Sequence, residues 1–263
     1  MSSISDFQPF PQTGRLAQNL NLSLDDLCLK IGELSQLATV YSYIVATVKN
    51  PEGHFIQTGS APNFQGDVIS LCTCKHYMRT FRTIDEWCDN IWIAGFTGTG
   101  AGKGKNVLIY LTKVGSAFEC YYDLWFSDKL SEAAKKFKLA HKNKFGDVFQ
   151  PQIELRDKFF DHRNKFGDDF QFQPQNYFPP VHNHVHANPN DWHKDINYLK
   201  GASGRKAALL MGDTQYSFLW NEPRLFYSHK LPRGQKKDNL QYLLTSLSEI
   251  RMNYESRNGQ NWN

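Results

Sequence analysis

Residues 90–114 read NIWIAGFTGTGAGKGKNVLIYLTKV, and this stretch decides the fold. Two runs rich in β-branched and aromatic residues, 91–96 and 107–114, flank a loop in which every second residue from Gly98 to Gly104 is glycine. A P-loop and a dinucleotide-binding glycine loop both open into a helix, whereas this loop opens into a second strand. The pattern therefore argues against a P-loop NTPase and a Rossmann enzyme. A long mobile hairpin connection is the preferred interpretation, and a dedicated phosphate cradle is the alternative.

The rest of the chain continues this succession of short strands with few helices. Ser23 precedes an apolar stripe at helical spacing, with Asp25 and Asp26 in the first turn, which predicts a capped helix. Further helices are expected over 127–142 and 239–254. Strands are predicted at 41–48, 68–72, 91–96, 107–114, 118–122, 206–212 and 215–220. We therefore predict an α+β fold with a curved, mostly antiparallel sheet or barrel and helices towards both ends.

The distribution of polar and aromatic residues sets the expected domain organisation. Residues 1–22 are polar and lack periodicity, so we expect a flexible N-terminal arm. Residues 23–263 are expected to form a single α+β domain, because a chain of 263 residues fits one large domain. Residues from about 143 to 200 lack periodicity but contain many aromatic residues, which indicates an irregular insertion rather than a disordered linker.

Composition limits the partners and the compartment. The net charge is +4, which is too small for a protein that coats nucleic acid, so a cationic binding surface has to be local. Aromatic residues make up 14% of the chain and provide rings for a stacking site. The five cysteines include no C-x-x-C pair and indicate reduced thiols. With neither a signal peptide nor a membrane-spanning segment in the sequence, we expect a cytoplasmic protein without a membrane partner.

Residues 72–79 read CTCKHYMR and place thiols, cations and hydroxyls at the end of a predicted strand. Buried structural cysteines are the preferred interpretation of these thiols. In the alternative, Lys75 and Arg79 would stabilise a thiolate and lower the cysteine pKa. A strand end followed by a turn also leaves backbone N–H groups without a ladder partner. We therefore expect Lys75 and Arg79 to contact an anion together with such N–H groups.

Residues 182–186 read HNHVH, and acidic residues follow. Three imidazoles are enough ligands for a zinc or non-haem iron site. Histidines at alternate positions of an extended segment fan along a line, however, whereas a metal ion needs ligands that converge on a point. We therefore expect neither a metal nor another cofactor. The other use of this region is acid–base chemistry, with His184 or His186 paired with Asp168 or Asp195.

Two basic stretches, 103–113 and 224–237, have aromatic residues beside them. The second stretch contains five Lys or Arg residues and no acidic residue. A solvated surface is the plain interpretation of such charge runs, and phosphate contact combined with base stacking is the alternative. The rings concerned are Trp92, Tyr110, Tyr121, Tyr122, Trp125, Phe226 and Tyr227.

Several short motifs occur in an order that resembles a known family. They are YSYIV at 41–45, APNF at 61–64, LCTCK at 71–75, IWIAG at 91–95, LIYLTKV at 108–114 and YYDLWF at 121–126. This order is similar to that of the second type of nucleotide-modification-associated domain of bacteria, phages and mobile elements. Further similarity near Asp168, His184 and His186 and at 208–218 extends the resemblance over about residues 41–220. The tryptophan strand and its loop also resemble PUA-like barrels, which hold a flipped base in an aromatic pocket.

The resemblance implies a role in DNA base modification or phage-related antiviral defence, without a particular activity. Our first hypothesis is a binding module for a nucleotide or a modified nucleic-acid base, with DNA as a further candidate partner. In it, aromatic rings stack on the base, threonines form hydrogen bonds and cations hold phosphate, with Lys75, Arg79, Trp92, Thr97 and Tyr110 in one pocket. The expected ligand-binding residues are Thr73, Cys74, Lys75, Arg79, Trp92, Gly95, Thr97, Gly98, Tyr110, Lys113, Tyr122 and Trp125.

Two alternatives belong to other classes of protein. One is an enzyme that adds or removes a group on a base or nucleotide. It would use Asp168 with His184 or His186 as acid and base, and Cys74 is a distant candidate nucleophile. The other is a host–phage interaction module without a small ligand, in which residues 143–198 form the interface.

Overall fold

The computed structural model describes residues 7–152, 170–181, 188, 191–200 and 204–250. Contacts group the chain into two compact units, each with its own hydrophobic core. Unit 1 comprises residues 1–8, 59–89 and 115–212, and unit 2 comprises residues 9–58, 90–114 and 213–263. The single domain over residues 23–263 stays a prediction.

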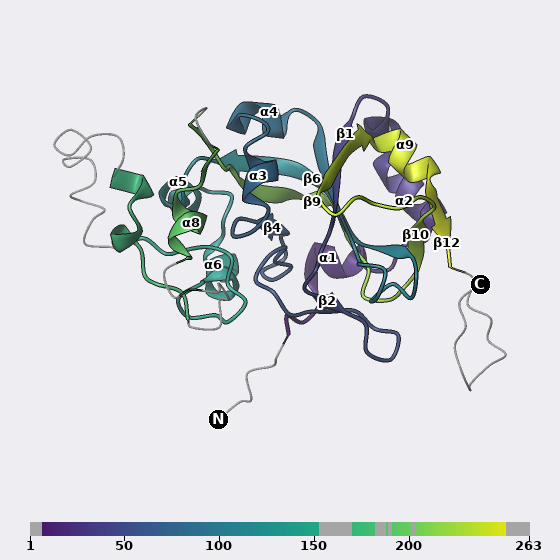
Figure 1. Ribbon diagram of the computed structural model, residues 1–263, viewed down its shortest axis with the longest axis horizontal. Coiled ribbons are helices and arrows are strands. Elements are labelled where there is room, and N and C mark those ends of the chain that lie inside the picture. The colour runs from purple at the N-terminus through teal and green to yellow at the C-terminus, as the bar shows by residue number, and fades with distance from the viewer. Residues whose placement is uncertain (1–6, 153–169, 182–187, 189–190, 201–203, 251–263) are drawn as a thin grey trace. The chain divides into compact units, whose positions relative to one another are not determined.

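The largest sheet has eight strands and is curved and mostly antiparallel, which confirms the predicted α+β fold class (Figure 1). Its strands are β1 (Thr39–Ile44), β4 (Ser70–Leu71), β5 (Ile91–Phe96), β6 (Asn106–Phe118), β9 (Leu209–Leu219), β10 (Leu225–Tyr227), β11 (Gln235–Asn239) and β12 (Leu247–Glu249). The main path runs β11-β1-β5-β6-β10-β12, and β9 pairs with both β6 and β4. The β1–β5 pair is parallel, whereas β5–β6, β6–β10 and β10–β12 are antiparallel.

Unit 2 contains further elements besides these strands. They are α1 (Gly14–Gln18), α2 (Leu24–Ile31), the 3-10 turn η1 (Gly32–Ser35), the hairpin of β2 (Val48–Lys49) and β3 (Ile56–Gln57), and α9 (Leu240–Thr245). Helix α9 lies against β1 and β12, and α2 also lies against β12 (Figure 1). As predicted, Ser23 caps α2, and its hydroxyl accepts the Asp26 N–H at 3.1 Å. Leu27 and Ile31 of α2 are buried in the core of unit 2.

The β5–β6 pair forms the centre of unit 2. Every residue of β5 is buried, which agrees with a sequence run that is apolar at almost every position rather than at alternate ones. The register pairs Gly95 with Tyr110. A Cβ atom at Gly95 would lie 2.1 Å from Cε1 of Tyr110, so glycine leaves the space that this ring occupies.

Unit 1 is built mainly from short helices and turns. They are α3 (His76–Arg79), α4 (Ile84–Cys88), α5 (Tyr121–Phe126), α6 (Glu132–Lys138), η2 (Phe170–Phe172), η3 (Pro174–Asn176), α8 (His193–Ile196) and the hairpin of β7 (Leu199–Lys200) and β8 (Arg205–Lys206). Its core contains rings from the predicted irregular insertion: Tyr177 packs against Tyr121, and Trp192 stacks on Phe149. Tyr177 and Trp192 of the insertion therefore serve packing.

Several predicted elements differ from the structure. The strand expected at 118–122 was wrong, because β6 ends at Phe118 and Cys120 caps α5 by accepting the Asp123 N–H. The helix expected over 127–142 is limited to α6, since Leu139 leaves the helix and bridges Val148. The closing helix expected at 239–254 ends at Thr245, because the chain then extends to form β12 beside β10.

Two more stretches are more ordered than the sequence pattern indicates. The strands predicted at 206–212 and 215–220 correspond mainly to one continuous strand, β9. Within the stretch predicted as a flexible arm, residues Gly14–Gln18 form α1, and Leu16 is completely buried. No helix among the described residues is long and apolar enough to cross a membrane.

Candidate functional site

A hollow of about 560 Å³ lies beside the glycine-rich loop in unit 2. Its lining residues are Thr99, Gly104, Lys105, Asn106, Phe226, Tyr227, Ser228, His229 and Lys230. Phe226 and Tyr227 of β10 pair with Val107 and Asn106 of β6. This pairing brings together the two basic stretches, 103–113 and 224–237, which are far apart in the sequence.

The glycine-rich loop is a turn with its own hydrogen bonds rather than an open connection. The N–H of Gly102 donates to the Gly98 carbonyl at 2.9 Å, and that of Gly104 donates to Thr99 at 2.7 Å. Gly104 has a φ of 92°, a conformation that glycine adopts readily. The hydroxyl of Thr97 accepts the Val107 N–H at 3.0 Å and fixes the loop to β6. The loop thus joins two antiparallel strands, as predicted, while its mobility stays a prediction.

Cations and rings meet in the hollow. The ammonium of Lys105 lies 4.1 Å from the ring centroid of the half-buried Phe226. His229 and Lys230 are exposed, and none of the described residues that line the hollow is acidic. The volume is in the range of small-molecule sites. An anionic group with an attached ring system therefore suits the hollow.

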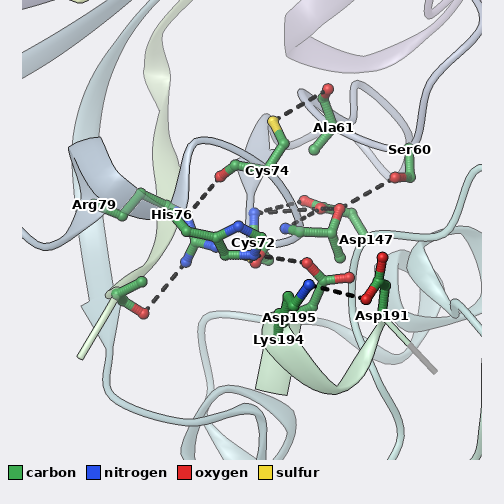
Figure 2. A network of polar contacts seen from close by, with 12 residues as sticks. Ser60, Ala61, Cys72, Cys74, His76, Arg79, Asp147, Asp191, Lys194 and Asp195 are labelled. Atoms are coloured by element: carbon green, nitrogen blue, oxygen red, sulfur yellow. Dashed lines mark hydrogen bonds and ion pairs between the residues drawn. The ribbon is translucent and has the colours of Figure 1, made fainter. Parts of the chain in front are cut away.

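Unit 1 contains a buried polar network around Asp147 (Figure 2). Its carboxylate accepts hydrogen bonds from the hydroxyls of Ser70 at 2.7 Å and Thr73 at 2.6 Å. It also accepts the backbone N–H groups of Cys72 and Thr73. These are strand-end N–H groups of the kind that we predicted for a ligand's anion. In the structure, an internal carboxylate occupies them.

Lys138 completes this network and is also fully buried. Its ammonium donates to the Asn63 side chain and to the Ser70 hydroxyl, both at 2.9 Å. Because Ser70 donates to Asp147, its hydroxyl links the buried cation to the buried anion. Burial lowers the pKa of Lys138 to about 8 and raises the pKa of Asp147. The network holds residues 70–73 in place and is closed to a ligand.

Arg79 and Cys74 also take part in internal contacts. The Arg79 guanidinium is completely buried and donates to the carbonyls of Cys72, Cys74, Ala207 and Ala208. Burial, together with Asp147, raises the pKa of Cys74 to about 12, which is the opposite of the lowered pKa in the alternative interpretation and agrees with the preferred one, a structural cysteine. Cys74 is therefore a thiol at neutral pH, which argues against its use as a nucleophile.

His76, which follows this segment, forms a pair with Asp195. Its Nε2 lies 2.7 Å from Oδ1 of Asp195 (Figure 2). The imidazole also stacks on Tyr198. The Asp195 side chain is completely buried, whereas 18% of the His76 side chain is exposed. A buried carboxylate that orients a partly exposed imidazole is an arrangement used in acid–base catalysis.

The structure places the predicted residues of unit 2 mainly in its core. Trp92 is completely buried and stacks on Phe218. Tyr110 is also buried, and its hydroxyl bonds to Tyr43 at 2.8 Å. Gly95 lies under that ring, Thr97 and Gly98 belong to the loop described above, and the ammonium of Lys113 lies 5.7 Å from the Tyr216 ring.

The remaining predicted residues belong to unit 1 or lie outside the described residues. Tyr122 packs on Phe126, and the largely buried Trp125 has the Lys135 ammonium over its ring. Lys75 directly precedes α3 as its N-cap residue, and burial lowers its pKa. Asp168, His184 and His186 lie outside the residues that the structure describes. The predicted pocket of Lys75, Arg79, Trp92, Thr97 and Tyr110 thus combines residues of both units, and it stays a prediction.

Sequence reasoning missed Lys138, Asp147 and the pairing of His76 with Asp195. Asp147 ends the motif NKFGD at 143–147, which recurs at 164–168, and this duplication was a signal that could have drawn attention to it. Lys138 is hidden among the lysines of α6, which a sequence pattern presents as a solvated face. No group of three or more His, Cys, Asp or Glu side chains suited to a metal occurs among the described residues.

A second hollow, of about 470 Å³, lies in unit 1. Arg82 and Arg205 line it together with Asp85 and Glu119. Cations and carboxylates therefore share its walls, which makes it less suited to a phosphate than the hollow of unit 2.

Comparison with known proteins gives no relative for this chain: no protein-family model matches it, and neither does a curated protein or a solved structure.

Proposed function

We propose that this protein binds a nucleotide or a modified nucleic-acid base in the hollow of unit 2. The observation that carries the proposal is the placement of Lys105 over the half-buried ring of Phe226, in a hollow whose described lining residues include no carboxylate. Phosphate needs cationic or N–H donors, and a base needs a flat apolar surface. Both requirements are met by neighbouring side chains of this hollow.

The arrangement of the hollow suggests how such a ligand lies. The base stacks on Phe226, while the Lys105 ammonium moves from the ring to the phosphate. Lys230 and the Thr99 hydroxyl line the same hollow and provide further donors. The order of sequence motifs, which resembles a nucleotide-modification-associated domain, supports a biological setting in DNA base modification or phage-related defence in the cytoplasm.

Calorimetric titration with ribonucleoside and deoxyribonucleoside monophosphates, including a hydroxymethylated deoxycytidine monophosphate, tests the proposal. We expect Phe226→Leu and Lys105→Gln each to weaken binding about tenfold, because each removes one of the two contacts. Lys129→Gln is the control, since Lys129 is an exposed lysine of unit 1. Absence of binding by every monophosphate would refute the proposal and favour the interaction module without a small ligand.

The His76–Asp195 pair supports a second candidate function, that of an enzyme acting on a base or nucleotide. In this role His76 transfers a proton, and Asp195 fixes the orientation of its ring. Chromatographic analysis of nucleotides and oligonucleotides incubated with the protein would reveal a product. His76→Asn should abolish turnover, whereas replacement of the exposed His54 should not. If His76→Asn retains full turnover, this role of the pair is refuted.

A further inference from the structure

The hollow of unit 2 continues into a second aromatic surface. The ring of His229, which lines the hollow, is parallel to that of Tyr242 on α9, with 6.3 Å between the ring centroids and an interplanar angle of 4°. Tyr242 is 47% exposed. Tyr242 therefore lies next to His229, just outside the hollow, and provides a second ring on which a base can stack.

Cations follow the same path. The connection between β10 and β11 contains Lys230 at the hollow and then Arg233, and both are exposed. It leads to Lys236, whose ammonium lies 5.2 Å from the Tyr242 ring centroid. Lys236 bonds to the Tyr227 hydroxyl and pairs with Asp238 at 2.9 Å, which fixes its position. A single nucleotide places its phosphate in the hollow. It would therefore leave Arg233 and Lys236, which lie beyond the hollow, without a phosphate to bind.

We infer that the ligand of this site is single-stranded nucleic acid. This inference rests on the proposed function and specifies its ligand class. One base occupies the hollow against Phe226, and the neighbouring base stacks on Tyr242. The intervening backbone passes Lys230 and Arg233. A duplex is unsuited to the site, because its base faces are already stacked on one another and cannot reach the two rings.

Fluorescence anisotropy with a labelled oligothymidylate of about 12 nucleotides tests the inference, since such a strand covers a typical single-strand site. We expect it to bind at least about tenfold more tightly than thymidine monophosphate and more tightly than the same strand in a duplex. Tyr242→Leu should weaken oligothymidylate binding about tenfold and leave monophosphate binding unchanged. Phe226→Leu should weaken the binding of both ligands.

Charge variants give a second, independent readout. Arg233→Gln should make the dependence of log Kd on log salt shallower by about 0.7, the value for one phosphate contact of a single strand. Lys237→Gln is the matched control. Lys237 is exposed on the same stretch, but it alternates with Lys236 along β11 and so points to the other face of the strand.

The outcomes separate this inference from the proposed function. If the monophosphate binds through Phe226 while the oligothymidylate binds no more tightly, or if Tyr242→Leu has no effect, the inference is refuted and the proposed function stands. If neither the oligothymidylate nor any monophosphate binds, both are refuted.

Discussion

Gly95 packs so closely against Tyr110 that even a methyl side chain at position 95 does not fit. We predict that Gly95→Ala lowers the free energy of unfolding by about 2 kcal/mol, a typical cost of overpacking a buried site. The added Cβ would lie 2.1 Å from Cε1 and 2.5 Å from Cδ1 of Tyr110, and 2.8 Å from Cγ2 of Val45. The ring is held by the bond between its hydroxyl and that of Tyr43. Urea unfolding measures the change.

Gly100→Ala is the matched control for this prediction. A Cβ at Gly100 meets no atom within 4 Å, so we expect a change below about 0.5 kcal/mol. Equal losses in the two variants would show that crowding by Tyr110 is not the cause.

Residue types near the strand end at 70–73 were predictable, but their partners were not. The sequence placed N–H groups, a threonine and two cations there, which pointed to a bound anion. The anion is Asp147, whose position is 74 residues from Thr73. Spacing along the chain carries no information on a contact of that separation, so the local pattern suggested an external ligand instead.

Among the elements, the cap of α2 gives a quantitative test. We predict that Ser23→Ala lowers the free energy of unfolding by about 1 kcal/mol, because the Asp26 N–H loses its acceptor at the helix start. Thr13→Ala is the control, since the Thr13 side chain makes no capping hydrogen bond to α1. Both variants can be compared by thermal unfolding. A loss for Thr13→Ala as large as that for Ser23→Ala would contradict the capping explanation.

Elements with a strong local signal were predicted well, and those decided by partners were not. Strand β5 coincides with the predicted 91–96, because a buried run of β-branched and aromatic residues specifies a central strand. The predicted helix at 239–254 stops at Thr245, because β10 acquires β12 as its neighbour. The pairing of β12 with β10 therefore overrides the helical spacing of apolar residues in the segment 240–250. The candidate hollow combines a predictable and an unpredictable feature. Its two basic stretches were visible in the sequence, but only the pairing of β6 with β10 brings them side by side.

For the whole molecule, the half-buried thiol of Cys74 predicts a loss of stability at alkaline pH. The pKa of Cys74 is raised to about 12 in the folded protein, so the folded state keeps a proton that the unfolded chain releases above about pH 9. The resulting stabilisation is complete below about pH 9 and is lost as the pH rises through 12. Cys74→Ser removes this titration and keeps a donor for the Ala61 carbonyl, which accepts from Cys74 Sγ at 3.4 Å.

We therefore expect the wild type to lose about 1–2 kcal/mol more than Cys74→Ser between about pH 8 and 10.5. Urea unfolding under reducing conditions at the two pH values measures the difference. Cys28→Ser is the control, because Cys28 is exposed and its pKa, although also raised by partial burial, is raised less than that of Cys74. An identical pH dependence in wild type and Cys74→Ser would contradict this prediction.

The position of β11 at the edge of the sheet affects how copies of the protein can associate with one another. In the part of the chain that the structure describes, β11 ends the path of the sheet and pairs with β1 alone. The outer backbone groups of such a strand can pair with a strand of another molecule and start aggregation. Lys237 places an exposed positive charge on this short edge, and two copies approaching edge to edge would bring their Lys237 side chains together. We therefore expect neutralisation of this charge to favour self-association of the protein.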